Sequence, residues 1–355
     1  FGKIDPSVWQ RPDVVPSVVM YAGIGGLSKG SIVRKGNKWI VCALAIEGEE
    51  DVAQAHQWNN PSIPIVVHTM KKMAEVLALV EEYLPKAHWG KMWIHASNSC
   101  KLAASANMLK RDMEASRADT LWAISVMHRM QPAIWTLENV PGLHQFFQGR
   151  FATCYIFDAN KYARCGQSRR RLLLSNRALH IRKHDENPLS MRDVLGEKKG
   201  WPKGQFLLQR NGYGNVKSVD HPSFTVTAGY LQAGAKFVGD FEDEHILTSD
   251  DRALLQGFPE PLVWPKHITE TKRKAYVAQC VAVPFAEVIS EAAFSYQDAC
   301  LESELVAAKL AQLEDMSEMD AFILTCALAD ERVNGGDDVS GAELLEAVGE
   351  RTVED

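Results

Sequence analysis

The chain has 355 residues, of which 46% are hydrophobic and 24% charged, a composition typical of a globular protein with one large or two modest domains. No apolar run reaches the roughly 20 residues of a membrane-spanning helix, so we expect no membrane partner. The seven scattered cysteines never form CxxC, which argues against a disulfide framework or zinc finger and favours a cytoplasmic protein (or a nuclear one in a eukaryote) over a secreted one. The net charge of −6 argues against a nucleic-acid partner if it is spread evenly.

Apolar strands alternate with amphipathic helices through the first 175 residues. Such an alternation predicts an α/β fold with a doubly wound, mainly parallel sheet. The expected strands are Ser17–Met20, Trp39–Ile46, Ile63–Val67, Met92–Ala96, Ala133–Leu137, Tyr155–Phe157 and Arg171–Leu174, and the expected helices are Met70–Leu84 and Asp112–Met130.

The pattern changes after residue 175. Residues 175–243 are richer in Gly, Pro, Asn and Lys and hold only short apolar pieces, at Phe206–Leu208 and Phe224–Thr227, which predicts a small irregular domain. Helices are expected again at Ser249–Leu255 and Tyr276–Phe294. From residue 298 onward the chain is acidic and helix-prone.

The charge is not spread evenly. Residues 298–355 contain 16 Asp and Glu but only 3 Lys and Arg, a balance of −13, so residues 1–297 carry +7. Residues 161–217 alone hold 14 Lys and Arg against 4 Asp and Glu. A positive field of this density suits a polyanion, although a solvated basic surface has the same composition. The net charge therefore does not exclude nucleic acid.

A glycine turn follows the first expected strand, at Tyr21-Ala22-Gly23-Ile24-Gly25-Gly26. Glycines let a ligand approach the backbone, and the next helix offers it N–H groups. Glu47, at the end of the second strand, is placed to hold a pair of ribose hydroxyls, as in nucleotide-binding α/β folds. A glycine turn that binds nothing has the same sequence, so the turn alone does not settle the function.

The order of the later segments is more specific. They are Leu137-Glu138-Asn139-Val140-Pro141-Gly142, Gln167-Ser168-Arg169-Arg170-Arg171, Leu247-Thr248 with Leu255-Gln256-Gly257-Phe258-Pro259, and Val283-Pro284. Together with the glycine turn, and in this order and spacing, they resemble the motifs of the DNA cytosine-5 methyltransferases over residues 17–293. The resemblance implies a Rossmann-like methyltransferase sheet, S-adenosylmethionine as cofactor and DNA as partner.

The same resemblance implies a catalytic set of Cys100, Glu138, Arg169 and Arg171. A thiolate that adds to C6 of cytosine turns the ring into an enamine and makes C5 nucleophilic, and Cys100 takes this position. Negative charge builds at N3 and O2, where Glu138 and Arg171 are expected, with Arg169 in support. Because a duplex hides C6, the base must be flipped out.

Two further groups of residues complete the expected site, and no metal is expected. The cofactor-binding residues are Tyr21, Ala22, Gly23, Ile24, Gly25, Gly26, Glu47, Thr69 and Val283. The DNA-binding residues are Lys101, Gln167, Arg192, Lys198, Lys199, Lys203, Arg210 and Lys217, most of which would meet phosphates.

Three segments depart from the family's pattern. Ser99-Cys100-Lys101 replaces Pro-Cys-Gln, Val67-His68-Thr69 lacks the usual Asp, and Cys280-Val281 stand where Gly-Asn precedes Val-Pro. These changes bear on the cofactor more than on the fold. The short stretch between Arg171 and Leu247 leaves little chain for reading base edges, which predicts a short or relaxed sequence preference.

The expected organisation is a catalytic domain of residues 1–175 and 246–297, a small target recognition domain of residues 176–245 and an acidic helical C-terminal extension of residues 298–355. Three alternatives stay open: the same fold adding a different group to C5, an inactive paralogue that binds DNA or a partner, and an RNA cytosine methyltransferase. The acidic extension is either a protein-binding segment or a solvated appendage.

Overall fold

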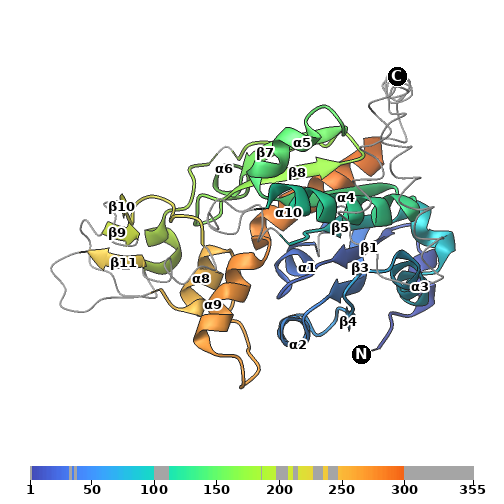
Figure 1. Cartoon of the computed structure of the whole chain (residues 1–355), viewed down its shortest axis with the longest axis horizontal. Coiled ribbons are helices and arrows are strands. Elements are labelled where there is room, and N and C mark those ends of the chain that lie inside the picture. The colour runs from blue at the N-terminus through green and yellow to red at the C-terminus, as the bar shows by residue number, and fades with distance from the viewer. Residues whose placement is uncertain are drawn as a thin grey trace.

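A large mixed sheet lies at the centre of the computed structural model (Figure 1). The structure describes residues 2–31, 34–35, 38–99, 112–184, 186–196, 207–210, 215–226, 235–238 and 247–299. Outside these ranges lie the acidic extension beyond its first two residues and the predicted site residues Cys100, Lys101, Lys198, Lys199 and Lys203.

The sheet has the strand order β4-β3-β1-β5-β6-β8-β7, with β2 paired antiparallel to β3. The strands are β1 (Val14–Met20), β2 (Arg34–Lys35), β3 (Lys38–Glu47), β4 (Ile65–Val67), β5 (Trp93–Ala96), β6 (Ile134–Asn139), β7 (Thr153–Asp158) and β8 (Arg170–Ser175). Strands β4, β3, β1, β5 and β6 are parallel, whereas β8 is antiparallel to both of its neighbours. The chain winds away from β1 in both directions, so the predicted doubly wound α/β fold is confirmed.

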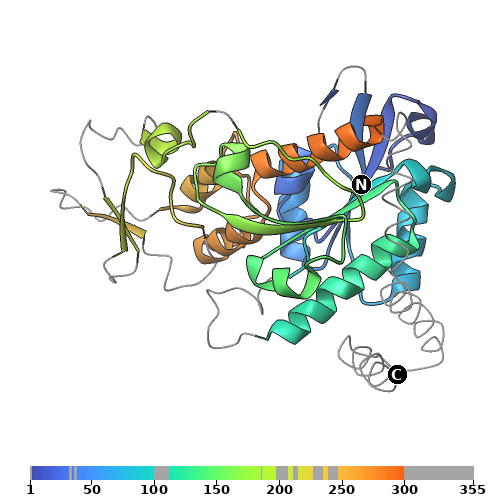
Figure 2. The same ribbon diagram turned by 90° about the horizontal axis from the view of Figure 1, so that it is seen from above.

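Helices cover both faces of this sheet. The α-helices are α1 (Gly26–Gly30), α2 (Glu50–Asn59), α3 (Met73–Tyr83), α4 (Met113–Arg129), α5 (His144–Phe147), α6 (Ala159–Ala163), α8 (Ser249–Leu255), α9 (Glu270–Gln279) and α10 (Val283–Ala299), and short helical turns occupy Pro6–Gln10, Lys86–Lys91, Pro141–Leu143 and Arg192–Gly196. Figure 2 shows α4 and α10 on opposite sides of the sheet.

Every residue of β1 is buried, because helices lie above and below it. Val14 and Val18 belong to the core cluster on the face of α3 and α4, and Val15 and Val19 belong to the cluster that includes α1 and α10. Burial on both faces explains why β1 is mostly apolar, with Ser17 its one buried hydroxyl residue, rather than alternating between apolar and polar side chains.

A three-stranded antiparallel sheet lies apart from the large one, with α8 and α9 between them (Figure 1). Its strands, β9 (Leu207–Arg210), β10 (Asn215–Ser218) and β11 (Ala235–Val238), fall within the expected recognition region. A separate apolar cluster fastens this region to α8 and α9; it contains Met191, Leu195, Val219, Val226, Leu247, Leu255 and Ala278.

Each of the seven strands expected from the sequence overlaps a strand of the large sheet. The helix expected at 276–294 was wrong as a single element, because α9 ends at Gln279 and α10 begins at Val283. Pro284 accounts for the break, since a proline ring inside a helix clashes with the carbonyl four residues earlier. The described part of Phe224–Thr227 forms no strand, and α2 was not foreseen.

One described helical stretch, Glu270–Ser295, is long and apolar enough to cross a membrane, which run length alone did not reveal. It spans α9 and most of α10, and 72% of its most apolar window is buried inside the molecule. Helix α10 packs against α1 and α6. Such burial is typical of a core helix.

Two histidines are buried in the α/β core. His95 in β5 lies with its Nδ1 2.7 Å from Thr136 Oγ1, and burial lowers its pKa to about 3. His56 in α2 lies with its Nε2 2.8 Å from Ser28 Oγ, and burial lowers its pKa to about 4. Both side chains are therefore neutral at pH 7.

These histidines predict a loss of stability in acid. The unfolded chain takes up protons at an ordinary histidine pKa of 6.5, above either folded value, so the free energy of unfolding should fall as the pH drops from 6.5 toward 4. Urea unfolding at several pH values should show a shallower fall for His95→Asn than for the unsubstituted chain. Equal slopes would mean that His95 is not buried in its neutral form.

Candidate functional site

Glu138, Arg171, Glu47 and the glycine turn lie at one edge of the large sheet. The parallel strands β1, β3, β5 and β6 end there, and loops at the carboxyl ends of parallel strands are where α/β folds bind ligands. Because β8 runs in the opposite direction, its first residues lie at this same edge. The topology thus brings the end of β6 and the start of β8 together.

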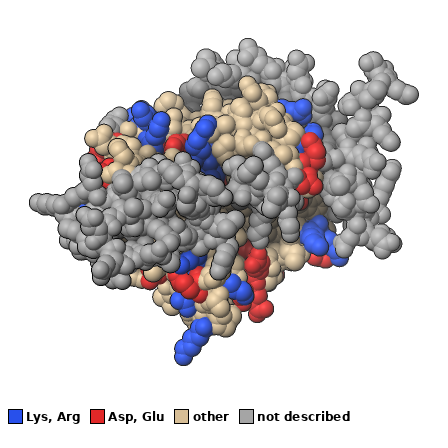
Figure 3. Space-filling view, turned by 60° about the vertical axis from the view of Figure 1, so that its left-hand side comes forward, with Lys and Arg blue, Asp and Glu red and all other residues tan. Residues whose placement is uncertain are grey.

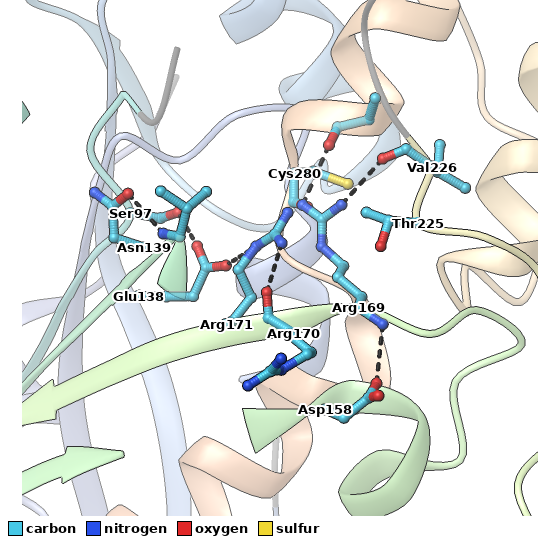
Figure 4. Close-up of polar contacts among 12 residues, drawn as sticks. Ser97, Glu138, Asn139, Asp158, Arg169, Arg170, Arg171, Thr225, Val226 and Cys280 are labelled. Atoms are coloured by element: carbon cyan, nitrogen blue, oxygen red, sulfur yellow. Dashed lines mark hydrogen bonds and ion pairs between the residues drawn. The ribbon is translucent and has the colours of Figure 1, made fainter. Parts of the chain in front are cut away.

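Glu138 and Arg171 form a buried ion pair at this edge (Figure 4). Glu138 Oε1 lies 2.6 Å from Arg171 Nε, and Glu138 Oε2 accepts a 2.7 Å hydrogen bond from Ser97 Oγ. The exposed fraction is 5% for Glu138 and 9% for Arg171. A carboxylate and a guanidinium that are held together and shielded from water form a rigid polar surface for a ligand.

The chain segment that leads to residue 100 is fixed by hydrogen bonds. Asn98 accepts at Oδ1 from Asn139 Nδ2 (3.0 Å) and donates through Nδ2 to Thr120 Oγ1 (3.2 Å). Ser97 and Asn98 were not given roles from the sequence. The pairing of Ala96 with Leu137 in neighbouring parallel strands puts Ser97 next to Glu138, so a correct register would have found that contact. The expected nucleophile, Cys100, lies outside the described residues.

The four cysteines that the structure describes are free thiols in unreactive surroundings. Burial raises the pKa of Cys42 and Cys280 to about 12 and that of Cys165 to about 11, and it also raises the pKa of Cys154. A thiol in such an environment is a poor nucleophile. In the described ranges, no group of three or more His, Cys, Asp and Glu side chains is placed to hold a metal ion.

The glycines of the turn differ in how tightly they are packed. A Cβ added at Gly25 would lie 2.1 Å from Asn60 Nδ2, and one added at Gly26 would lie 2.1 Å from the carbonyl oxygen of Val281. At Gly23 (φ +57°) the nearest atom to an added Cβ, in Cys280, is 3.9 Å away. Gly25 and Gly26 therefore serve close packing, whereas a Cβ at Gly23 would meet Cys280 at an ordinary van der Waals distance.

Glu47, the last residue of β3, is hydrogen-bonded to the backbone of this turn. Its Oε2 accepts from the Gly23 N–H (2.8 Å), and its Oε1 accepts from the N–H groups of Gly48 (2.8 Å) and Glu49 (3.1 Å). Burial nevertheless raises the pKa of Glu47. A Cβ added at Gly48 would lie 3.9 Å from the Thr69 Cα, so Thr69 is a neighbour of the same turn.

The other expected cofactor residues have different surroundings. Ala22, Ile24 and Val283 are buried in apolar clusters, where they pack the turn against its neighbours. Burial, followed by the negative charges of Asp119 and Glu47, raises the pKa of Tyr21, the residue with which the turn begins. Asp119, on α4, carried no sequence signal.

Gln167 corrects a sequence prediction. Its side chain is fully buried, donates through Nε2 to Gln256 Oε1 (2.7 Å) and accepts at Oε1 from the Val226 N–H (2.9 Å). A side chain enclosed in this way fastens parts of the protein to one another, and it has no surface for the expected contact with DNA.

Arg169 also holds protein segments together. Only 2% exposed, it donates to the carbonyl oxygens of Val226 (3.3 Å), Ala278 (3.2 Å) and Cys280 (3.0 Å), as Figure 4 illustrates. Its backbone N–H donates to Asp158 Oδ1 (2.9 Å). These contacts are to backbone carbonyl oxygens and to Asp158, and the expected support of Arg171 by Arg169 stays a prediction.

The expected phosphate contacts are described only in part. Arg192 Nε lies 2.6 Å from Asp220 Oδ1, so this arginine has an acidic partner within the protein. Arg210 and Lys217 lie in β9 and β10, and their side chains are outside the described residues. On the face drawn in Figure 3, the basic and acidic side chains of the described residues are interspersed.

No protein-family model matches the chain, and no curated protein matches its sequence. Solved structures do match. A DNA modification methyltransferase encoded within an E. coli prophage has a TM-score of 0.55 at 14% identity, over 80% of this chain and 99% of the other. The Entamoeba histolytica methyltransferase EhMeth has a TM-score of 0.56 at 13% identity (80% and 98%), and S. pombe Dnmt2 methyltransferase one of 0.53 at 16% identity (78% and 98%).

These structural similarities establish the fold of the chain. The chain has the Rossmann-like methyltransferase fold that the motifs imply, so the resemblance to the cytosine-5 methyltransferases is confirmed at the level of the fold.

The two kinds of glycine predict different effects of substitution. Gly26→Ala should lower the free energy of unfolding by about 2 kcal/mol or more, because the new Cβ would press on the backbone oxygen of Val281. Gly23→Ala should cost only about 1–2 kcal/mol, for its left-handed conformation. Urea unfolding measures both. Equal losses would contradict the packing role of Gly26.

The ion pair predicts strong coupling between its members. Glu138→Gln leaves a buried guanidinium without its partner, which should cost about 3 kcal/mol or more. Glu138→Gln combined with Arg171→Met should cost clearly less than the sum of the single losses in a double-mutant cycle. The exposed pair of Lys3 and Glu82, with its atoms 3.0 Å apart, is the control and should show almost no coupling. Additive losses at Glu138 and Arg171 would contradict the pairing.

Proposed function

We propose that the protein transfers a methyl group from S-adenosylmethionine to C5 of cytosine in DNA. The observation that carries the proposal is the buried pair of Glu138 and Arg171, at the sheet edge where β5 leads toward Cys100. The methyltransferase fold of the chain supports the choice of reaction, and the basic stretch at residues 161–217 supports a nucleic acid as substrate.

The residues around the glycine turn fit an adenosyl cofactor. A carboxylate offers about four acceptor positions, and Glu47 uses three of them for backbone N–H groups, so one remains for a ribose hydroxyl. Gly23 is less tightly packed than Gly25 and Gly26, since a Cβ there would meet only Cys280, at 3.9 Å. Bound S-adenosylmethionine would supply an electrophilic methyl group. The role of this chain would be to hold the ribose at Glu47, whose carboxylate also binds the Gly23 N–H.

The base chemistry is assigned to Cys100, Glu138 and Arg171. The Cys100 thiolate forms a bond to C6 of a flipped cytosine, and the electrons of the C5–C6 double bond move into the ring, which leaves C5 nucleophilic. A carboxyl group at N3 and a guanidinium at O2 stabilise the charge that develops there. After methylation, loss of the C5 proton restores the double bond and expels the Cys100 thiolate.

Preorganisation is the contribution that the described side chains make to this chemistry. The Glu138 carboxylate is held from both sides, by Ser97 and by Arg171, so it needs little rearrangement when charge develops on the base. Donors and acceptors fixed in a site shielded from water stabilise a developing charge more than mobile water does. The contacts of Glu138 with Ser97 and Arg171 therefore hold its carboxylate ready for this role.

The product of the reaction tests this proposal. We expect 5-methylcytosine, identified by mass spectrometry of nucleosides, after the protein is incubated with cytosine-containing duplex DNA and S-adenosylmethionine. A single-stranded and a transfer-RNA substrate run in parallel would reveal an RNA preference. If no cytosine acquires any group on any of the three substrates, the proposed activity is wrong.

Covalent trapping tests whether Cys100 is the nucleophile. In the presence of S-adenosylmethionine the protein should form a stable adduct with 5-fluorocytosine DNA, because after methylation C5 carries fluorine in place of the proton that the final elimination removes. Cys100→Ser should abolish both the adduct and the product. The matched control Cys154→Ser changes a half-buried thiol in β7 and should leave both intact. An adduct that persists in Cys100→Ser would remove Cys100 from the mechanism.

A further inference from the structure

The backbone of Val226 is held on both sides by side chains of one short segment. Gln167 Oε1 accepts from the Val226 N–H (2.9 Å), and Arg169 Nη1 donates to the Val226 carbonyl oxygen (3.3 Å). Between these contacts, Ser168 accepts at its carbonyl oxygen from Thr225 Oγ1 (2.5 Å). Val226 belongs to the expected recognition region, so Gln167 and Arg169 join that region to the start of β8.

The same two side chains hold the junction between α9 and α10. Arg169 Nη2 donates to the carbonyl oxygens of Ala278 and Cys280. Gln167 reaches the junction through Gln256, whose Nε2 donates to the Val277 carbonyl oxygen (2.7 Å). One polar network thus contacts both the recognition region and residues 277–280.

Residues 280 and 281 form the wall behind the glycine turn. The Val281 carbonyl oxygen is so close to Gly26 that no side chain fits between them, and Cys280 is the nearest neighbour of an added Cβ at Gly23. Direct contacts therefore run from Val226 through Arg169 to Cys280 and on to the turn. The steps are the hydrogen bonds of Arg169, the peptide bond between Cys280 and Val281, and the close approach of the Val281 carbonyl oxygen to Gly26.

Because Arg169 is buried, its contacts with Val226 and with the α9–α10 junction resist displacement. A guanidinium that is 2% exposed cannot replace a lost carbonyl with water, so a shift of Val226 either breaks a charged hydrogen bond at high cost or moves the guanidinium with it. A moving guanidinium changes its bonds to Ala278 and Cys280. The position of the recognition region and the position of the turn's wall are therefore linked.

We propose that Arg169 and Gln167 are positioning residues that couple nucleic-acid binding at the recognition region to ligand binding at the glycine turn. The inference rests on the proposed function, since it takes DNA and an adenosyl compound as the two ligands. Coupling of this kind is reciprocal: each ligand changes the affinity for the other by the same factor, typically about 5- to 150-fold.

Calorimetric titration of the full chain with S-adenosylhomocysteine, which carries no methyl group to transfer, measures this factor. We expect the dissociation constant to change at least about 5-fold when saturating duplex DNA is present. Arg169→Lys keeps the charge but cannot reach three carbonyl oxygens at once, so the factor should fall to nearly 1. Gln167→Met removes the amide contacts at similar size and should act in the same direction.

Arg177→Lys is the matched control. Arg177 also donates to a backbone carbonyl, that of Ala133 (3.1 Å), but it follows the end of β8 at the opposite edge of the sheet. The same chemical change at this position should leave the coupling factor as it is. A factor that survives in both Arg169→Lys and Gln167→Met would overturn the proposal, as would independent binding of the two ligands to the unsubstituted chain.

Hydrogen exchange without any adenosyl compound gives a second readout. DNA alone should slow amide exchange in residues 21–31 and 276–283 of the unsubstituted chain and of Arg177→Lys, but not of Arg169→Lys. If S-adenosylhomocysteine does not bind at all, the proposed function fails, and the exchange data still decide the coupling. Unchanged exchange in both segments on addition of DNA would overturn it.

Discussion

The ion pair between Glu138 and Arg171 is the constraint around which the site is arranged. Taking two charges out of water costs several kcal/mol each, and this cost is offset only if each charge meets the other and its remaining polar atoms find partners. Glu138 meets this requirement with Ser97, and Arg171 meets it with the carbonyl oxygen of Arg170 (2.8 Å). The pair therefore requires that the end of β5, the end of β6 and the start of β8 stay together.

The antiparallel strand β8 is what makes the pair possible. A strand parallel to β6 would bring its last residues to this edge, whereas β8 brings its first ones. Gln167, Arg169 and Arg171 are spaced two apart in an extended segment, so their side chains leave the backbone on the same side. Arg171 turns to Glu138, while Gln167 and Arg169 reach Val226 and the helices behind the glycine turn. One stretch of five residues thus serves both the sheet edge at Glu138 and the joint between the two regions.

The sequence predicted the large sheet well, because strands covered on both faces are short, mostly apolar segments bounded by turns, as β1 is. It predicted the roles of individual polar residues less well. Gln167 begins the motif that continues with Arg169 and Arg171, so it was expected to contact DNA, and only its tertiary partners explain its complete burial. The sequence also does not distinguish a glycine that makes room for a ligand from one that packs against another part of the chain. In the structure, Gly25 and Gly26 are of the second kind. The contact of Ser97 with Glu138 depends on the register between β5 and β6, which apolar periodicity does not fix.

The basic stretch at residues 161–217 shows why a count of charges differs from the charge that a partner meets. Arg169 and Arg171 are buried, and their positive charges are used by carbonyl oxygens and by Glu138, so a phosphate cannot replace these partners without opening the core. Arg192 has its partner, Asp220, near the surface, where an ion pair contributes at most about 1 kcal/mol and is readily exchanged for another anion. The buried arginines therefore shape the site, and only those near the surface can neutralise a nucleic acid.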